Sequence, residues 1–322
     1  RTVMDRLHFS GGVPDNTALA ALALDICKQL AVPRYSNFRS VCLLLYREGD
    51  RFRAEVGMNS EVVGLTGSCS AERSVIAKML MRHGGRSPLV GVEKLVLVTD
   101  APHCVLPGYQ CREILREHVD PSVLVVCAWR SEEDGHLKKI QSLTVSIEEL
   151  HPYPSPYLHM ASKEVSELAE QFARRCAPVP RQPADWHRLY EATRAIARAH
   201  PASSSRAGVH YAAGAMFFSG DIRTCEAAPA QEPSCSLEAI SRLSAWLEEH
   251  SRQDDLPQLI LISDQWGVLH APFAVGRGYL IEHGYGDVSI LLHDSCTAEL
   301  RELRCRDLGG GVDCKAHDSC HR

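Results

Sequence analysis

The sequence lacks two features that would assign it early to a class of protein. No run of about 18 uninterrupted apolar residues, the minimum for a transmembrane helix, occurs among its residues. It also lacks an excess of basic residues, because 35 Lys and Arg stand against 40 Asp and Glu, for a formal net charge of −5. Phosphate contacts need clustered Lys and Arg, so this balance argues against a nucleic-acid partner.

Regularly spaced cysteines, the mark of a secreted disulfide framework, are missing as well. The 13 cysteines are odd in number and scattered, and Cys42 and Cys127 lie within apolar runs where a thiol acts as a small buried hydrophobe. We therefore expect an intracellular, reducing compartment, either the cytoplasm or an organelle interior. Because the chain begins with Arg1 rather than Met, removal of a presequence is one interpretation, although it names no organelle.

What is present is an alternation of helix-like and strand-like patterns. The 322 residues suit two average domains, and the alternation predicts an α/β fold whose sheet is at least partly parallel. The expected helices are 18–30, 71–85, 111–118, 162–176, 187–200, 236–250 and 276–284, and the expected strands are 40–48, 52–59, 93–101, 122–129, 209–218, 257–264 and 288–294.

The second half of the chain repeats the first. Five residues recur at one constant offset: Pro107, Arg112, Leu115, Glu117 and His118 match Pro272, Arg277, Leu280, Glu282 and His283, and at nearly the same offset Glu72 matches Glu238. This repetition predicts a duplicated domain. We expect a first domain over 1–160, a helix and linker over 161–185, a second domain over 186–304 and a Cys/His-containing tail over 305–322.

Five short motifs of the first half resemble those of one enzyme family. They are Tyr35-Ser-Asn-Phe38, Asn59-Ser-Glu61, Ser70-Ala-Glu-Arg73, Pro107-Gly-Tyr-Gln-Cys-Arg112 and Glu148-Glu-Leu-His-Pro152. In this order and spacing they resemble the motifs of the cytidine deaminases in their tandem two-domain form. The resemblance implies two domains, each a mixed β-sheet of about five strands flanked by helices. It further implies a nucleoside-binding role for Phe38, Asn59 and Glu61.

The resemblance also shows where the family's zinc chemistry is damaged. A zinc deaminase holds the metal with three Cys or His side chains and activates a water, while a glutamate that is not a ligand shuttles protons. Glu72 lies at the glutamate position, but the three ligand positions hold Ser70, Gly108 and Cys111. Only Cys111 is a family ligand, because serine is a poor zinc ligand and glycine has no side chain. We therefore expect Glu72 to be a vestigial proton shuttle and no metal to bind.

The second repeat departs further from the family. By the same matching, Ser236, Phe273 and Gly276 stand at the ligand positions, and Cys225 and Ala227 replace the Asn and Glu that would hold the ribose. Glu238 is interpreted as the remaining counterpart of Glu72. The second site is accordingly predicted to be inert.

Two alternatives for a metal remain open. Cys69, Cys104 and Cys111 could form an irregular ligand set, although a ligand moved back by one helical residue is rotated by about 100°. The tail offers further residues of zinc-binding type, namely Cys305, Cys314, His317, Cys320 and His321. Their spacing matches no familiar zinc finger, and a flexible tail with incidental thiols is the preferred interpretation.

Loss of ligands in a retained fold predicts a catalytically inactive protein that acts as a structural or binding subunit of a larger assembly, without a cofactor. Its expected partners are proteins, a second copy of the chain, or both. One alternative is an active zinc-dependent cytidine or deoxycytidine deaminase that uses Glu72 with an irregular ligand set. The other is a noncatalytic regulator that binds a nucleoside through Phe38, Asn59 and Glu61.

Overall fold

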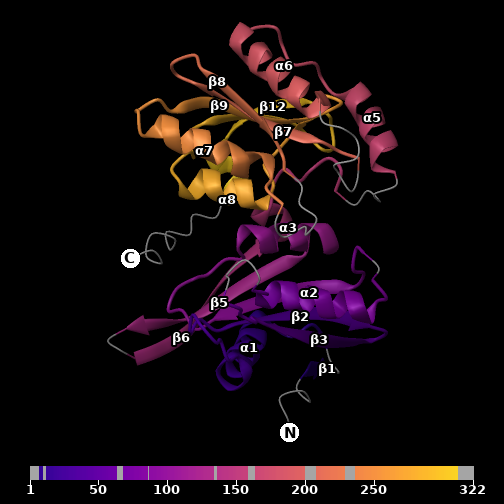
Figure 1. Cartoon of the computed structure of the whole chain (residues 1–322). Coiled ribbons are helices and arrows are strands. Elements are labelled where there is room, and N and C mark those ends of the chain that lie inside the picture. Colours follow the sequence, from indigo (N-terminus) through magenta and orange to yellow (C-terminus); the bar gives the residue numbers. More distant parts are fainter. Residues whose placement is uncertain are drawn as a thin grey trace. The chain divides into compact units, whose positions relative to one another are not determined.

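The computed structural model describes residues 7–9, 12–63, 68–85, 87–133, 136–158, 164–199, 208–228 and 236–310. The chain divides into two compact units, here unit 1 (Arg1–Leu150) and unit 2 (His151–Gly310). Figure 1 shows that each unit contains a β-sheet with helices packed on it. Within the described ranges, no helix is both long enough and apolar enough to cross a membrane.

Unit 1 is built on a mixed sheet in which only β4 and β5 run parallel. The strands follow the order β1-β3-β2-β4-β5-β6 across the sheet. Their bounds are β1 (His8–Phe9), β2 (Ser40–Glu48), β3 (Arg51–Met58), β4 (Val92–Thr99), β5 (Leu124–Glu133) and β6 (His136–Ser146). The central strands are continuous apolar runs because helices cover both faces of the sheet.

The helices of unit 1 lie on opposite faces of that sheet. Helix α1 (Asn16–Leu30) covers one face, and its first turn is capped by Asp15, whose carboxylate accepts the Ala18 amide proton at 2.9 Å. Helices α2 (Ala71–Arg82) and α3 (Tyr109–His118) cover the other face, followed by the short α4 (Ile147–Leu150). The two faces therefore have separate hydrophobic cores.

Unit 2 repeats this topology. Its strands follow the order β12-β11-β9-β7-β8, β9 and β11 are parallel, and β10 pairs with β9. Their bounds are β7 (Tyr211–Phe217), β8 (Ile222–Glu226), β9 (Pro257–Asp264), β10 (Leu269–His270), β11 (Ser289–His293) and β12 (Leu300–Arg304). Helix α6 (Ala184–Ala199) packs on one face, and α7 (Ala239–Ser251) and α8 (Ala274–Glu282) pack on the other.

Two further elements complete unit 2. Helix α5 (Val165–Arg175) packs Ala169 and Phe172 into a smaller cluster of buried residues. The 3-10 helix η5 (Cys305–Gly309) follows β12, and its Cys305 is fully buried in the main core. Cys305 is therefore a core residue of unit 2 rather than part of a tail, whereas Cys314, His317, Cys320 and His321 lie outside the described residues.

The predicted fold class is confirmed: the chain is α/β, with two mixed sheets of about five main strands each, flanked by helices. The residue patterns gave no signal for β6, β8 or β12. β6 and β12 each pair with a single neighbouring strand, and no residue of β12 is buried. Such edge strands carry polar side chains and lack the apolar run that marks a central strand.

Candidate functional site

The N-terminus of α2 forms one half of the candidate site in unit 1. Ser70 is its N-cap, and the Ser70 hydroxyl accepts the Arg73 amide proton at 3.2 Å. A short bridge between Ser60 and Cys69 leads the chain into this helix. Gly57 on β3 lets the helix approach closely, because a Cβ at Gly57 would lie only 2.8 Å from the Cβ of Val75.

The N-terminus of α3 forms the other half. Gly108 is its N-cap, and Cys111 lies one turn into the helix. The two helix ends meet where Ser70 Oγ lies 3.1 Å from Cys111 Sγ. Glu72, in the first turn of α2, is also buried there. The structure thus brings together Ser70, Glu72 and Cys111, as their places in the family motifs predict.

Burial disfavours the charged forms of both titratable groups of this cluster. It raises the pKa of the Glu72 carboxyl group above its usual range, against hydrogen bonds with Ser70 and Cys111 that lower it. Burial and the neighbouring Glu72 charge together raise the pKa of the Cys111 thiol to about 12.

The donor set does not fit a catalytic zinc ion. Cys111 is the only sulfur or imidazole ligand among the three family positions, and a Cβ added at Gly108 would meet nothing within 4 Å. Cys69 Sγ lies 3.7 Å from the carbonyl of Ser70, and Cys104 packs against the core beneath α2 and α3. In the described part of the chain, no group of three or more His, Cys, Asp or Glu side chains is placed to hold a metal ion.

The predicted nucleoside-binding residues form hydrogen bonds within the chain. Asn59 accepts the Ser40 amide proton at 3.0 Å and donates to the Phe38 carbonyl at 2.8 Å. The Glu61 carboxylate accepts the amide protons of Tyr35 (2.8 Å) and Ser36 (3.1 Å) and the Ser36 hydroxyl proton, and these bonds lower its pKa. The side chain of Phe38 is partly exposed beside them. Asn59 and Glu61 therefore hold the segment before β2 in place.

The strand pairing of unit 2 corrects the predicted matching of the two sites. The bridge between Ala228 and Leu237 leads into α7 as the bridge between Ser60 and Cys69 leads into α2. The residue after Leu237 is Glu238, which is the N-cap of α7. Glu238 therefore corresponds to Ser70, so the predicted match of Glu238 with Glu72 is wrong by two residues.

The same shift applies to the other matched residues. Ile240 corresponds to Glu72, and Ser236 lies before the first ligand position rather than at it. The Ala227 amide donates to the Tyr211 carbonyl as the Asn59 amide donates to that of Ser40. Ala227 is thus the counterpart of Asn59, which the sequence matching had assigned to Cys225. The position that matches Glu72 is therefore held by buried Ile240, which has no titratable group.

In unit 2, other side chains fill the space around the matched positions. Gly276 occupies the Cys111 position in α8, and a carboxylate oxygen of Glu238 lies too close to leave room for a Cβ at Gly276. Phe273 occupies the Gly108 position as the N-cap of α8, and its ring packs edge-on against Tyr211 with the centroids 5.1 Å apart. This end of unit 2 is therefore a packed arrangement rather than an open site.

An arginine performs the same structural task in both units. Arg112 and Arg277 are buried, and each donates from Nε to the carbonyl of the proline before its helix, Pro107 or Pro272, at 2.7 Å. Their guanidinium groups also reach carbonyls that follow the last sheet strand. Because both arginines serve the backbone of their own unit, their recurrence reflects the fold and not the chemistry of a site.

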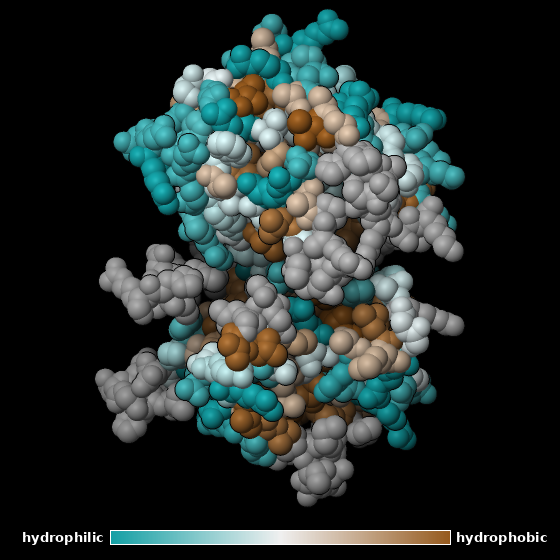
Figure 2. All heavy atoms as spheres, in the orientation of Figure 1, coloured by the Kyte–Doolittle hydropathy of each residue, from teal (hydrophilic) through white to brown (hydrophobic). Residues whose placement is uncertain are grey.

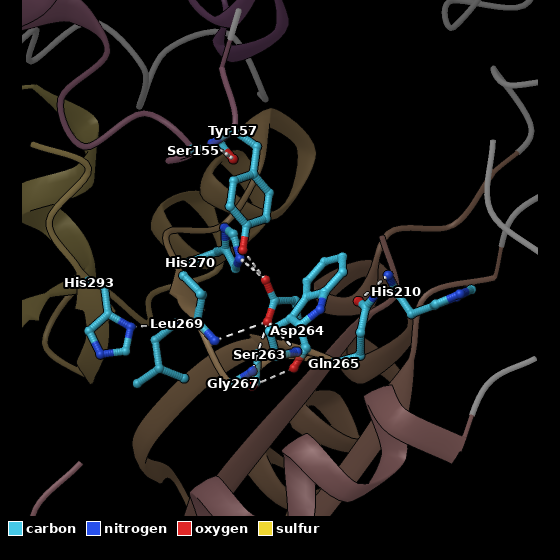
Figure 3. Close-up of polar contacts among 12 residues, drawn as sticks. Ser155, Tyr157, His210, Ser263, Asp264, Gln265, Gly267, Leu269, His270 and His293 are labelled. Carbon is cyan, nitrogen blue, oxygen red and sulfur yellow. Dashed lines mark hydrogen bonds and ion pairs between the residues drawn. The ribbon is translucent and has the colours of Figure 1, made fainter. Parts of the chain in front are cut away.

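Sequence patterns missed a buried polar cluster in unit 2 (Figure 3). Asp264, at the end of β9, accepts the amide protons of Trp266, Gly267 and Val268 at 2.9 Å each through Oδ1. Its Oδ2 accepts the hydroxyl proton of Tyr157 and lies 3.2 Å from His270 Nε2. All three side chains are buried. The cluster ties the segment before α5 to the turn after β9, a contact that no local pattern records.

Comparison with known proteins gives limited matches. No family model and no curated protein matches the chain. Among solved structures, part of the chain is similar to a cytidine deaminase from Burkholderia pseudomallei, at 20% identity over 44% of this chain and 99% of that one, with a TM-score of 0.36. The cytidine deaminase from Mycobacterium tuberculosis is 23% identical over 38% of this chain and 93% of that one, with a TM-score of 0.32. The cytidine deaminase from Mycobacterium leprae is 22% identical over 41% of this chain and 93% of that one, with a TM-score of 0.28.

Proposed function

We propose that this chain is a cytidine-deaminase-like protein without deaminase activity that serves as a structural or binding subunit of a protein assembly. The observation that carries the proposal is the contact between Ser70 Oγ and Cys111 Sγ, 3.1 Å long. A hydroxyl and a neutral thiol face each other where the family motifs call for two thiolates around zinc. Without a metal-bound hydroxide, Glu72 has no nucleophile to serve.

Unit 2 supports the same proposal. Glu238 and Phe273 fill the space of the family ligands, and Ile240 stands in place of the glutamate. In both units the helix ends serve to hold the sheet and its flanking helices together.

Exposed hydrophobic side chains near the degenerate site of unit 1 support a role in binding another protein. Tyr35, Phe38, Val62 and Val63 are 56%, 38%, 47% and 82% exposed. They lie on the two segments that Glu61 and Asn59 tie together, and we call them the site rim. On the face shown in Figure 2, hydrophobic residues occur in several small groups among hydrophilic ones. Grouped exposed apolar side chains of this kind are typical of contact surfaces.

The loss of catalysis is tested by zinc content and turnover. We expect protein purified without added metal to contain no stoichiometric zinc, and we expect Cys111→Ala to have the same metal content. Neither cytidine nor deoxycytidine should be deaminated. About one zinc per chain that disappears in Cys111→Ala, together with release of uridine, would instead identify a deaminase with an irregular ligand set.

The binding role is tested separately, by the apparent mass of the protein in a native extract. We expect the full chain to migrate in a larger assembly and Val63→Asp to release it as a smaller species. Val90→Asp is the matched control, because Val90 is 81% exposed but lies in the segment between α2 and β4. If both variants migrate like the unmodified chain, the site rim is not the contact surface.

A further inference from the structure

A small pocket opens on the α1 face of the unit 1 sheet, opposite the face that carries Ser70 and Cys111. Its volume is about 120 Å³, and it lies between the last turns of α1 and the ends of β4 and β5. In α/β sheets, ligands commonly bind outside the carboxyl ends of parallel strands, and β4 and β5 are the parallel pair of this sheet. The motifs of the first half do not include this pocket.

Strand periodicity gathers charged side chains at the mouth of the pocket. Val41, Val98 and Ala128 are buried residues of the α1 face on three neighbouring strands. Side chains alternate between the faces of a sheet, so the residues one period beyond them at this end point to the same face. These residues are Arg39, Asp100 and Arg130, and Lys28 of α1 lines the pocket with them.

The charges around the pocket do not cancel. Asp100 accepts the Arg39 amide proton at 3.0 Å, and its other oxygen lies 3.8 Å from the Arg39 guanidinium, so this acid and this base compensate each other. Arg39 is further fixed by a hydrogen bond from Nε to the Ala31 carbonyl at 3.1 Å. Arg130 Nε is buried and has no hydrogen-bond partner among the described residues. Asp100 thus compensates Arg39, and Arg130 and Lys28 remain as the other two cations of the pocket lining.

The floor of the pocket is apolar. Leu24 and Cys27 line it and are almost fully buried. Burial, with a smaller contribution from Asp100, raises the pKa of the Cys27 thiol to about 11, so the thiol stays neutral near pH 7 and does not offset the basic residues. A neutral floor beneath two cations is suited to an anionic group that carries a short hydrocarbon part.

We propose that this pocket binds a small organic anion. Its carboxylate or phosphate pairs with Arg130 and Lys28, and its short apolar part lies on Leu24 and Cys27. The volume of the pocket is below the range of about 300–1,000 Å³ usual for larger ligands, so the ligand is a few carbon atoms long. Binding at this pocket involves neither zinc nor the cluster of Ser70, Glu72 and Cys111. Failure of this proposal would therefore leave the proposed function unaffected, and the reverse also holds.

The test is calorimetric titration of the full chain with three probes at constant low ionic strength: n-butyrate, n-butyl phosphate and inorganic phosphate. We expect saturable binding of at least one alkyl probe, weakened about tenfold or more in Arg130→Gln and in Lys28→Gln, because each variant removes a charge-assisted hydrogen bond. Lys28 is exposed, so Lys28→Gln tests the site without disturbing the core. Arg47→Gln is the control, because Arg47 pairs with Glu93 at the opposite end of the sheet. We expect this variant to bind the probes with unchanged affinity.

Each outcome decides a part of the proposal. Tighter binding of n-butyl phosphate than of n-butyrate identifies a phosphate ligand, and the reverse order identifies a carboxylate. Inorganic phosphate that binds as tightly as n-butyl phosphate overturns the role of the apolar floor. The site itself is overturned if no probe binds saturably at tens of millimolar, or if Arg47→Gln weakens binding as much as Arg130→Gln does.

Discussion

A carboxylate oxygen of Glu238 occupies the space beside Gly276 in which a side chain at that position would begin. The Cβ of Ile240 stands on another side of the same space, 2.9 Å from where a Cβ at Gly276 would lie. Glu238 and Ile240 begin α7, and Gly276 lies in the first turn of α8. The absence of a side chain at Gly276 is therefore what allows these two helix ends to pack.

This packing predicts that Gly276→Ala destabilises unit 2. The added methyl group forces Ile240 and Glu238 apart at a cost of about 1–3 kcal/mol, which outweighs the gain of about 1 kcal/mol in helix propensity. The measurement is the free energy of unfolding in urea. Gly108→Ser is the matched control: its Cβ would meet nothing within 4 Å, and serine is a good N-cap, so stability changes by no more than about 0.5 kcal/mol. Equal effects of the two substitutions would contradict the assigned packing.

The open space at Gly108 predicts that unit 1 can be made to bind zinc. In the double variant Ser70→Cys/Gly108→Cys, two new thiols join Cys111 at the two helix ends, which supplies the three ligands that a catalytic zinc site needs. We expect about one zinc per chain by elemental analysis and a zinc-dependent rise in Tm. The single variant Ser70→Cys and the triple variant that adds Cys111→Ala should bind none. A double variant that stays free of zinc would show that the helix ends do not converge as described.

The buried carboxyl of Glu72 predicts a stabilising substitution. The pKa of the Glu72 carboxyl group is raised in the folded state. The contribution of this group to the free energy of unfolding is therefore complete below its pKa in the unfolded chain, and it is lost as the pH rises through its pKa in the folded protein. Glu72→Gln remains neutral throughout. We therefore expect the variant to be more stable than the unmodified chain at pH 7, on the order of 1 kcal/mol, with the difference vanishing near pH 4. Thermal unfolding across this range measures it, and a loss of stability at pH 7 would contradict it.

The buried imidazole of His293 predicts a loss of stability in acid. Burial lowers its pKa, and the Nδ1 atom accepts the Leu269 amide proton at 2.9 Å, so the ring is neutral with its proton on Nε2. Its contribution is complete above the unfolded pKa, near 6.5, and falls as the pH is lowered toward the folded value. We expect His293→Asn, whose oxygen can still accept from Leu269, to flatten the pH dependence of the unfolding free energy between pH 7 and 5. An unchanged slope would exclude the role of His293.

The parts of the fold that were predicted from sequence share one property. Strands such as β2 and β4, and helices such as α2, are buried on at least one side, so they appear as apolar runs or stripes. The stop of α2 was also predictable, because Gly84 and Gly85 adopt positive φ after it. β6 and β12 were missed because each is held in the sheet by pairing with one neighbouring strand, and neither has an apolar pattern of its own that marks it as a strand.

The candidate site was predictable in unit 1 and misaligned in unit 2. The convergence of Ser70, Glu72 and Cys111 follows from helix starts whose spacing the motifs fix. In unit 2, a nearly constant offset placed Glu238 opposite Glu72. The strand pairing shows why that offset fails: Cys42 pairs with Gly57, whereas Ala213 pairs with Cys225, so the second hairpin is shorter. The connection from α7 to β9 (252–256) is also shorter than that from α2 to β4 (83–91).

These differences in length have a practical use. The same sheet and helix positions are reached with a long or a short hairpin, and with a long connection after α2 or a short one after α7. The turn over 218–221 and the connection over 252–256 are therefore natural points for inserting a short epitope tag or a photo-crosslinking residue. A label at either of these points would allow the partners of the intact chain to be captured while both termini stay unmodified.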